Sequence, residues 1–513
     1  MPHQNPNSSY KIWEPFLLAL CLSVGMFIGY DMFKDKSDLV LVDSTQGNNH
    51  ISALGIGRVE EILRIVENSY VDQLESETLI DEAITQIVNK LDPHSHYINS
   101  EEFEDYNQKM SGVYQGMGIV SKFIEDTLYV CHVSDDSEGF KAGLLSGDKI
   151  LAMNQDTISG VNKDMNYVLK LLRNIQDDFC QTEVLRANEL LNLNVHLQEQ
   201  ITSSADLNYV LNDNIGVVKV SRFSANTYDQ FFKSLESIQE KLGRSNFDLI
   251  LDLRNNPGGY VPQTLRILSQ LFTEKNQLLS FTEGENRNRK DYKSTGRNFF
   301  DVEKIVVLIN ENSASASEII AGAIQDWDRG VVIGTNSYGK GLVQEIFPLK
   351  KGGAIRLTVA RYGTPSGRFI QRPYTVNGEK KMTEDSTYQT RKLGRILKNN
   401  DGISPDIEVE SKALYNPQIA DFVVSKILPY HLVVPLSILK EKEFDLVAAF
   451  DLEPNNLFQG EEDLLLLKAE LIHSWYGPLP YYKFINSIDP TFAKAIEIIS
   501  DEDALKFLAS KEN

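Results

Sequence analysis

The spacing of apolar residues near the N-terminus predicts two amphipathic helices. Two sets of apolar residues between positions 59 and 91 recur three or four positions apart, which places them on one face of a helix. The first set is Val59, Ile62, Leu63, Val66 and Tyr70, and the second is Leu79, Ala83, Ile84, Ile87 and Leu91.

From about residue 103 to 196 the apolar residues form short runs interrupted by glycine. Examples are G-V-Y-Q-G-M-G-I at 112–119, L-Y-V-C-H-V at 128–133 and A-G-L-L-S-G-D-K-I-L-A-M-N at 142–154. Short apolar runs bounded by turn residues are typical of strands. This segment is therefore predicted to be a small, mostly β module.

Beyond this module, strand-like apolar runs alternate with helical patterns. The predicted strands are 215–220, 248–253 and 305–309, and the predicted helices are 228–242, 265–272 and 317–327. Such alternation is typical of crossover units in a sheet of parallel strands. A hairpin is predicted at 343–362 around the turn K-K-G-G, and the acidic, leucine-rich sequence from about 411 carries no recognisable chemical motif.

Residues 15–30 form an uncharged, largely apolar segment between Glu14 and Asp31. Its length falls between the apolar core of a signal peptide and a full transmembrane helix. No A-x-A-like cleavage site follows it. We favour an uncleaved membrane anchor at 13–33, after a short tail at 1–12, over a cleaved signal peptide. Either interpretation places the bulk of the chain outside the cytoplasm.

Composition narrows the classes of partner and site. The 513 residues contain 51 Lys and Arg against 72 Asp and Glu, a net charge of −21, which argues against a nucleic-acid partner because phosphates would be repelled. The three cysteines are too few and too scattered for a disulfide framework or a zinc site. His94 and His96, in L-D-P-H-S-H-Y, are interpreted as part of a structural turn rather than as metal ligands.

Three serines alternate with alanine in N-E-N-S-A-S-A-S-E, residues 310–318, directly after the predicted strand 305–309. A strand, a turn and then a helix place the middle serine, Ser315, near a helix N-terminus, where free N–H groups favour developing negative charge. The alternative is a helix cap, a role that Ser313 would fill without catalysis. Three alternating serines exceed what capping requires, so Ser315 is a candidate nucleophile.

A nucleophilic serine needs a base, which is either a histidine from elsewhere or a neutral lysine. Lys340 in S-Y-G-K-G-L-V-Q is a candidate, provided that burial lowers its pKa. Gln344, four positions later in a strand-like run, is expected on the same face, where a neutral amide can hold the amine. The alternative for Lys340 is an exposed lysine in a turn.

D-L-R-N-N-P-G-G, residues 252–259, follows a predicted buried strand. Its Pro-Gly-Gly end can present bare N–H groups to an oxyanion, although a plain turn would use the same residues.

Together these stretches resemble the carboxyl-terminal processing peptidases, also called tail-specific proteases. The resemblance runs from about residue 52 to 410 and includes L-D-P-H-S-H-Y, L-D-L-R-N-N-P-G-G, N-S-A-S-A-S-E-I-I-A-G-A, Y-G-K-G-L-V-Q and G-I-S-P-D-I-E-V. The segments G-M-G-I and A-G-L-L-S-G-D-K-I-L-A-M-N are similar to parts of a PDZ domain. S-A-S-A-S-E followed by G-K-G-x-V-Q at this spacing is highly specific.

The resemblance implies a role for each matched residue. It implies Ser315 as nucleophile, Lys340 as general base and Gln344 as the amide partner of the lysine. The implied oxyanion donors are the amide of Ala316 and that of either Gly258 or Gly259. A substrate C-terminus would bind the PDZ loop formed by Gly116, Met117, Gly118 and Ile119, while the peptide adds as a strand.

This module departs from the PDZ pattern in two places. Gln155-Asp156 replace the usual glycine, and L-L-R-N-I-Q-D-D-F replaces L-R-G-x-x-G. These departures bear on loop lengths and peptide preference, and they leave the catalytic motifs unchanged.

The expected fold is an α/β protease core of crotonase-like type with an inserted PDZ domain, an N-terminal helical segment and a helical C-terminal extension. The expected organisation is an N-terminal helical part of the protease at 34–102, the PDZ domain at 103–196, the peptidase core at 197–410 and the extension at 411–513. The expected role of the extension is helical packing or dimerisation.

The expected function is that of a Ser-Lys endopeptidase in the periplasm, anchored in the membrane and cutting exported proteins near their C-termini. We expect no metal or cofactor, polypeptide substrates with a free C-terminus, and a homo-oligomer or an adaptor protein as a partner. The rival functions are a non-catalytic PDZ adaptor and a ligand carrier or acyl-CoA enzyme on a crotonase-like fold.

Overall fold

The computed structural model describes residues 53–73, 75–205, 207–350, 352–372, 387–398, 401–410, 414–430, 439 and 460–502. The chain divides into two compact units, Met1–Ile80 and Asp81–Asn513. The segment predicted as a membrane anchor, 13–33, lies outside the described residues. Among the helices that are described, none combines the length and the apolar character needed to span a bilayer.

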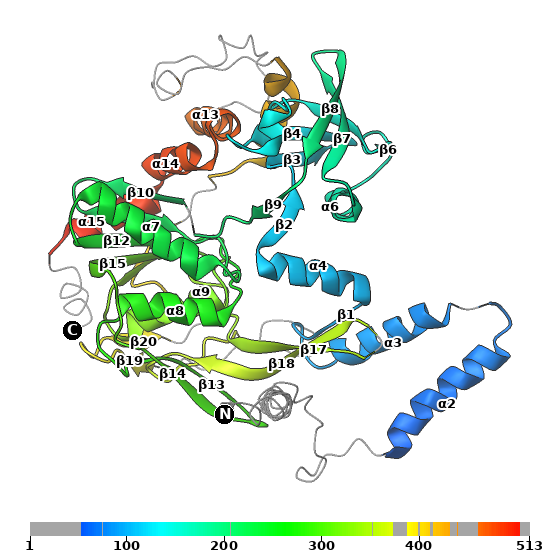
Figure 1. Cartoon of the computed structure of the whole chain (residues 1–513). Coiled ribbons are helices and arrows are strands. Elements are labelled where there is room, and N and C mark those ends of the chain that lie inside the picture. Colours follow the sequence, from blue (N-terminus) through cyan, green and yellow to red (C-terminus); the bar gives the residue numbers. More distant parts are fainter. Residues whose placement is uncertain are drawn as a thin grey trace, which may run out of the picture. The chain divides into compact units, whose positions relative to one another are not determined.

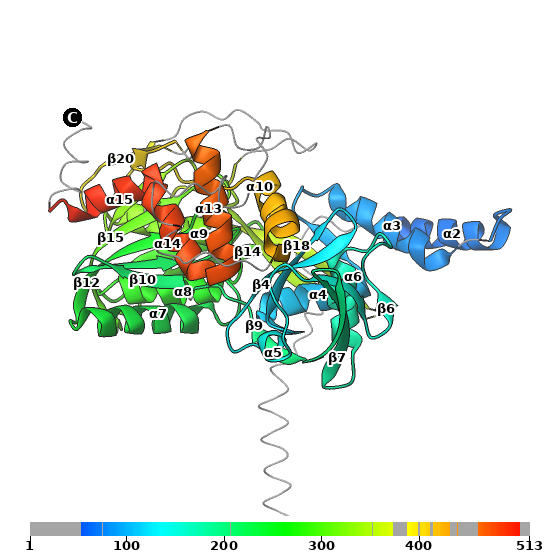
Figure 2. The ribbon, with the colours of Figure 1, turned by 90° about the horizontal axis from the view of Figure 1, so that it is seen from above.

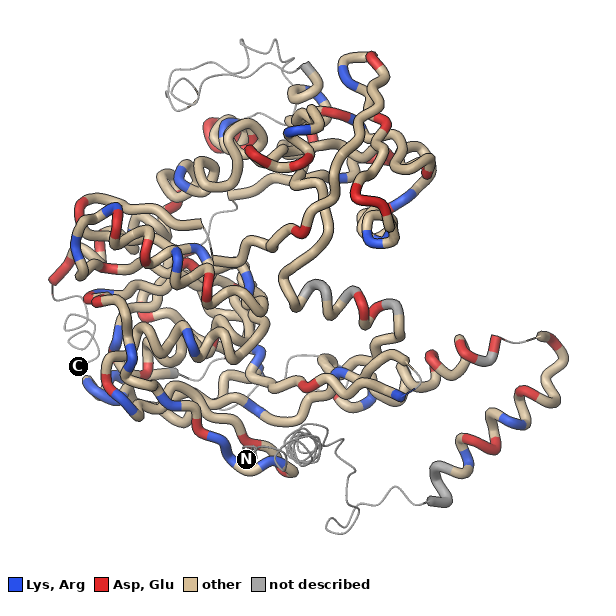
Figure 3. Tube along the Cα trace, viewed as in Figure 1, with Lys and Arg blue, Asp and Glu red and all other residues tan. Residues whose placement is uncertain are grey.

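Both predicted N-terminal helices form. Helix α2 spans Ala53–Ser69 and helix α3 spans Ser76–Asn89. Ile62 and Ile65 on α2 are more than half exposed. Acidic and basic residues are interspersed along the described chain (Figure 3).

The predicted parallel sheet is confirmed, and it forms the centre of the second unit (Figure 1). Its strand order is β10 (Leu207–Leu211), β11 (Ile215–Lys219), β12 (Asn246–Asp252), β15 (Asp301–Ile309), β16 (Val331–Gly334) and β21 (Ile407–Glu408). Strands β11 to β21 run parallel, and β10 pairs antiparallel with β11. Parallel strands require crossover connections. Between β11 and β16 these connections contain helices, whereas the described part of the connection from β16 to β21 contains strands.

Helices cover both faces of this sheet, as its nearly continuous apolar strands require. One face packs against the helices predicted from sequence, which are α7 (Thr227–Leu242), α8 (Val261–Leu271) and α9 (Ala316–Asp326). The other face packs against α14 (Pro478–Ile488) and α15 (Pro490–Ser500) through Tyr482 and Phe492 (Figure 2). The motif-free C-terminal sequence therefore completes the core of the sheet.

A second sheet contains the predicted hairpin. Strands β17 (Leu342–Pro348) and β18 (Ala354–Gly363) pair antiparallel, and β18 also pairs with β1 (His96–Ile98) and β13 (Leu278–Gly284), which pairs with β14 (Arg287–Lys293). The pairing of β1 with β18 brings the L-D-P-H-S-H-Y segment beside the second strand of the hairpin that follows G-K-G.

The predicted β module also forms. Its sheet has the order β3 (Ile119–Ile124), β4 (Thr127–Val133), β5 (Lys149–Met153), β7 (Phe179–Arg186) and β8 (Glu189–His196), with β6 (Asp156–Thr157) beside β5 and helices α5 (Glu138–Lys141) and α6 (Met165–Asn174). Strands β2 (Val113–Gly116) and β9 (Gln198–Ile201) pair where the chain enters and leaves the module.

C-terminal helices also pack on this module. Helices α10 (Pro417–Phe422) and α13 (Glu461–Tyr476) belong to an apolar cluster that includes Tyr129 of β4. Lys122 of β3 pairs with Asp421 at 2.5 Å. His132 Nδ1 lies 3.1 Å from the carbonyl oxygen of Ser474. The C-terminal segment therefore contacts both the module and the parallel sheet.

Candidate active site

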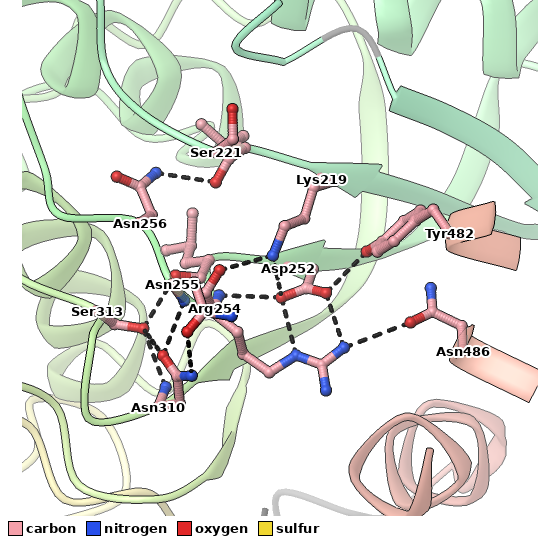
Figure 4. Close-up of polar contacts among 12 residues, drawn as sticks. Lys219, Ser221, Asp252, Arg254, Asn255, Asn256, Asn310, Ser313, Tyr482 and Asn486 are labelled. Atoms are coloured by element: carbon pink, nitrogen blue, oxygen red, sulfur yellow. Dashed lines mark hydrogen bonds and ion pairs between the residues drawn. The ribbon is translucent and has the colours of Figure 1, made fainter. Parts of the chain in front are cut away.

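The three alternating serines have different environments. Ser313 and Ser317 are fully buried. The Ser313 hydroxyl donates to the carbonyl of Leu253 at 2.9 Å, and the Ser317 hydroxyl donates to the carbonyl of Asn256 at 3.0 Å (Figure 4 shows Ser313). Both fasten the serine segment to the 252–259 loop. Only Ser315 is partly exposed, so it is the one hydroxyl of the three that a substrate can reach.

Ser315 is the N-cap residue of α9, with φ 54° and ψ −109°. A positive φ is strained for a residue with a Cβ and costs on the order of 1–3 kcal/mol. The amide of Ala314 donates to the carbonyl of Asn256 at 2.9 Å, which holds the turn just before the strained residue. The predicted position at a helix N-terminus is confirmed, and Ser315 rather than Ser313 occupies the cap.

Gly258 lies directly against Ser315. A Cβ atom at position 258 would stand 2.9 Å from the Cβ of Ser315 and 3.0 Å from the amide nitrogen of Ala316, so only glycine leaves this space open. The amide of Gly258 itself donates to Oδ1 of Asn256 at 2.8 Å. Within the described part of the chain, the amides of Ala316 and Gly259 have no hydrogen-bond partner.

A buried carboxylate joins the serine turn to the lysine loop. Glu318 Oε2 accepts from the amides of Ser315 at 2.7 Å and Lys340 at 2.8 Å. Glu318 Oε1 accepts from the Ser337 hydroxyl at 2.6 Å and the Gly339 amide at 2.7 Å. Burial raises the pKa of Glu318, and the four donated hydrogen bonds oppose that rise. One side chain therefore fixes the backbone of both predicted catalytic residues.

Lys340 is partly buried in the loop before β17, not in the strand itself, so the argument from alternating strand faces was wrong for it. Burial lowers the pKa of Lys340, and the nearby positive charge of Arg356 lowers it further. The flanking glycines allow a close approach to a neighbouring segment, because a Cβ at Gly341 would lie 2.6 Å from the amide nitrogen of Gln371. The environment favours the neutral amine that a base requires.

Gln344 donates from Nε2 to the backbone carbonyl of His94 at 2.5 Å, across 250 positions of sequence. The turn that presents this carbonyl is held by Asp92 Oδ1, which accepts from the amides of His94 at 2.8 Å and Ser95 at 2.7 Å. The interpretation of L-D-P-H-S-H-Y as a structural turn is thereby confirmed. Among the described residues, no group of His, Cys, Asp and Glu has the arrangement of a metal site.

Sequence reasoning missed two neighbours of the lysine. Glu318 lies three residues after the N-cap residue, where a glutamate side chain commonly accepts a hydrogen bond from the N-cap amide. This spacing could have identified Glu318 from the sequence. His94 lies close enough for the charge of Lys340 to act on it. Burial lowers the pKa of His94, and Lys340 lowers it further.

The predicted peptide-binding loop joins β2 to β3. Gly116 ends β2 and Ile119 begins β3, the terminal strand of the module sheet. Met117 is buried, and its carbonyl accepts from the amide of Gly139 at 2.8 Å. Gly118 has φ 73°, a conformation that favours glycine.

Comparisons with known proteins agree with this arrangement. The family described as peptidase family S41 matches residues 214–385. A carboxy-terminal-processing protease of Bartonella bacilliformis is 33% identical over 351 residues, covering 67% of this chain and 80% of that protein. The carboxy-terminal processing protease CtpB of Bacillus subtilis is 26% identical, covering 68% of this chain and 72% of that protein. A probable CtpA-like serine protease of Staphylococcus epidermidis is 26% identical, covering 70% of this chain and 71% of that protein.

The match to the Bartonella protein extends well beyond the residues around the serine. It covers four fifths of that relative at one-third identity, and the S41 match spans the segment that holds Ser315 and Lys340. The chain therefore belongs to peptidase family S41, together with carboxy-terminal processing proteases, and is a serine-type peptidase.

Proposed function

We propose that this peptidase uses a Ser-Lys mechanism, with Ser315 as nucleophile and Lys340 as general base. The observation that carries the proposal is the Glu318 carboxylate, which accepts from the amides of both residues and so holds the two loops together. The lowered pKa of Lys340 supports the same assignment, because a base must be neutral before it takes a proton.

In this mechanism, neutral Lys340 Nζ takes the proton of Ser315 Oγ as that oxygen attacks the scissile carbonyl carbon. The tetrahedral intermediate collapses, the lysine gives the proton to the leaving amine, and an acyl-enzyme remains. Water then attacks the acyl carbon with Lys340 again as base. This cycle restores the free serine and releases the second product.

The oxyanion of the intermediate is assigned to the amides of Ala316 and Gly259. Both amides lack partners among the described residues, whereas that of Gly258 is bound to Asn256. Gly258 instead leaves space beside Ser315, because it has no side chain. Donors fixed before the reaction stabilise the developing charge without reorganisation.

Gln344 is assigned to orienting the lysine amine. Its Nε2 is occupied by the His94 carbonyl, which leaves Oε1 as the acceptor for an amine hydrogen. A neutral amide orients the amine without adding the negative charge that would raise its pKa.

The β module at 103–196 is assigned as a PDZ domain that captures substrate tails, inserted between the N-terminal helical part at 34–102 and a crotonase-like peptidase core at 197–410. β3 is the terminal strand of the module sheet and begins at the G-M-G-I loop, which suits a peptide adding as a further strand. The substrates are exported proteins cut near their C-termini. The segment 13–33 is assigned as the anchor that holds the enzyme at the outer side of the membrane.

Cleavage of casein and of a peptide with a free C-terminal tail tests the activity. We expect both to be cut, and mass spectrometry of the tailed peptide is expected to place the cuts near its C-terminus. Added chelator should not change the rate, because the proposed mechanism uses no metal. Binding of the tailed peptide without any cleavage would instead indicate a PDZ adaptor, and hydrolysis of an acyl-CoA alone would indicate a crotonase-like enzyme.

The tail-capture role predicts a preference for a free C-terminal carboxylate. One peptide is compared as the free acid and as the C-terminal amide, by binding to the enzyme and by kcat/KM. We expect the amide to bind at least about tenfold more weakly, since it cannot accept from the loop amides as an anion. Equal binding of the two forms would contradict tail recognition while leaving the catalytic assignment in place.

A further inference from the structure

A buried network of charges includes Asp252 and Arg254 at the start of the 252–259 loop (Figure 4). Asp252, at the end of β12, is fully buried and accepts from Arg254 Nε at 3.0 Å and Nη2 at 2.8 Å. Lys219 Nζ lies 3.3 Å from Asp252 Oδ1 and donates to the carbonyl of Arg254 at 2.6 Å.

Residues of the C-terminal helices extend this network. The Tyr482 hydroxyl of α14 donates to Asp252 Oδ2 at 2.8 Å (Figure 4). Arg254 Nη1 donates to Oδ2 of Asp489, the N-cap residue of α15. Asp489 brings the count to two cations and two anions, so the network has no net charge.

The network continues into the catalytic loop through the backbone. Arg254 is followed by Asn255, whose amide donates to Asn310 Oδ1 at 2.8 Å. The next residue is Asn256, whose backbone carbonyl accepts from the amide of Ala314 at 2.9 Å. The side-chain oxygen of Asn256 accepts from the amide of Gly258 at 2.8 Å. Every link between the charge network and Ser315 is thus a described hydrogen bond or a neighbouring peptide unit.

From this geometry we infer that Asp489 and Tyr482 are positioning residues for the oxyanion site. The C-terminal helices are therefore part of the catalytic apparatus, in addition to covering the sheet. The inference rests on the proposed function, because it needs the 252–259 loop to serve the oxyanion.

The charges explain why the loss of one partner, such as Asp489, would change the conformation of the 252–259 loop. Burial alone would raise the pKa of Asp252, but the adjacent Arg254 and Lys219 hold it well below its usual range. Two cations thus share this carboxylate, and Asp489 supplies the second anion for Arg254. A buried ion that loses one partner is strongly destabilised and reorients. Arg254 is part of the 252–259 loop, so its movement displaces the amides of the loop.

Asp489→Asn separates this role from helix capping. Asp489 Oδ1 also accepts from the amide of Thr491 at 2.9 Å, and asparagine caps a helix about as well as aspartate. The substitution therefore keeps the cap and removes the negative charge. Tyr482→Phe keeps the ring in its apolar cluster and removes the hydroxyl. The matched control is Lys494→Ala on α15, which breaks only an exposed pair with Glu497.

The experiment compares the full-length variants with the parent enzyme, at a temperature where thermal unfolding shows all of them folded. We expect Asp489→Asn to lower kcat at least about tenfold with KM within about twofold, because the oxyanion forms only after binding. Affinity for a peptide boronic acid, which forms a tetrahedral adduct on the serine, should fall by a similar factor. Tyr482→Phe should show the same pattern more weakly, and Lys494→Ala should match the parent enzyme.

A double substitution tests whether Asp489 acts through Arg254. If it does, Arg254→Gln with Asp489→Asn should be no slower than Arg254→Gln alone, whereas independent effects would multiply. Parent-like kcat and boronate affinity in folded Asp489→Asn, a change in KM alone, or multiplying effects would each overturn the inference. Activity remaining in Ser315→Ala would instead overturn the proposed function, so the two failures are distinguishable.

Discussion

Ser315→Ala is expected to abolish peptide hydrolysis while leaving the fold intact. Loss of a catalytic serine costs on the order of 10⁶ in kcat in serine proteases. Thermal unfolding should change little, because Ser315 is only partly buried, and alanine retains the Cβ that packs beside Gly258. The measurement is kcat/KM for the tailed peptide, with circular dichroism on the same samples.

The neighbouring serines supply matched controls for this prediction. Ser313→Ala and Ser317→Ala should keep substantial activity, since each removes a structural hydrogen bond to the 252–259 loop. Each should lower the free energy of unfolding by about 1–3 kcal/mol, because buried groups lose their partners. Full activity in Ser315→Ala, or complete loss in both controls without unfolding, would remove Ser315 from the role of nucleophile.

Lys340→Arg is expected to be inactive at every pH compatible with the fold, because a guanidinium stays protonated and cannot accept the serine proton. In the parent enzyme, kcat/KM should rise with pH along an acidic limb governed by Lys340. Burial and Arg356 lower its pKa, so the limb should lie below the ordinary lysine value of about 10.4. The rate rises rather than falls with pH because the amine is protonated and inactive below its pKa and is neutral above it.

Three further variants distinguish the role of Lys340 from the roles of Gln344 and His94. Lys340→His should not restore activity, since the shorter ring cannot reach the serine. Gln344→Ala should lose less than either lysine variant. His94→Gln should keep most activity, because the contact of His94 with Gln344 uses the backbone carbonyl. Robust turnover by Lys340→Arg, with loss in His94→Gln, would transfer the role of base to the histidine.

Local patterns in the sequence predicted the elements of the parallel sheet and its helices well. The apolar runs at 215–220, 248–253 and 305–309 became β11, β12 and β15, because a parallel strand covered on both faces must be apolar along its length. The helix start after Ser315 was likewise visible, since the turn, the small residues and the apolar face lie within a few positions of one another.

Contacts between distant segments were not predictable in the same way. Gln344 and His94 are separated by 250 positions, and nothing in either stretch specifies the other. Lys340 and Gln344 were expected on the same face of a strand-like run, whereas β17 starts at Leu342 and leaves Lys340 in the loop before it. The role of the C-terminal helices was also hidden, since an apolar face alone does not reveal the surface that it covers.

The second face of the parallel sheet has a consequence for the order of events during synthesis. All six strands are translated before α14 and α15, the helices that cover this face. A nascent chain that has reached Glu408 still exposes Tyr209, Ile250 and Leu308 on that side, and it lacks the anion that pairs with Arg254. Such a chain lacks the Arg254–Asp489 ion pair at the 252–259 loop. On the proposed mechanism, activity would therefore begin only after translation has passed α15.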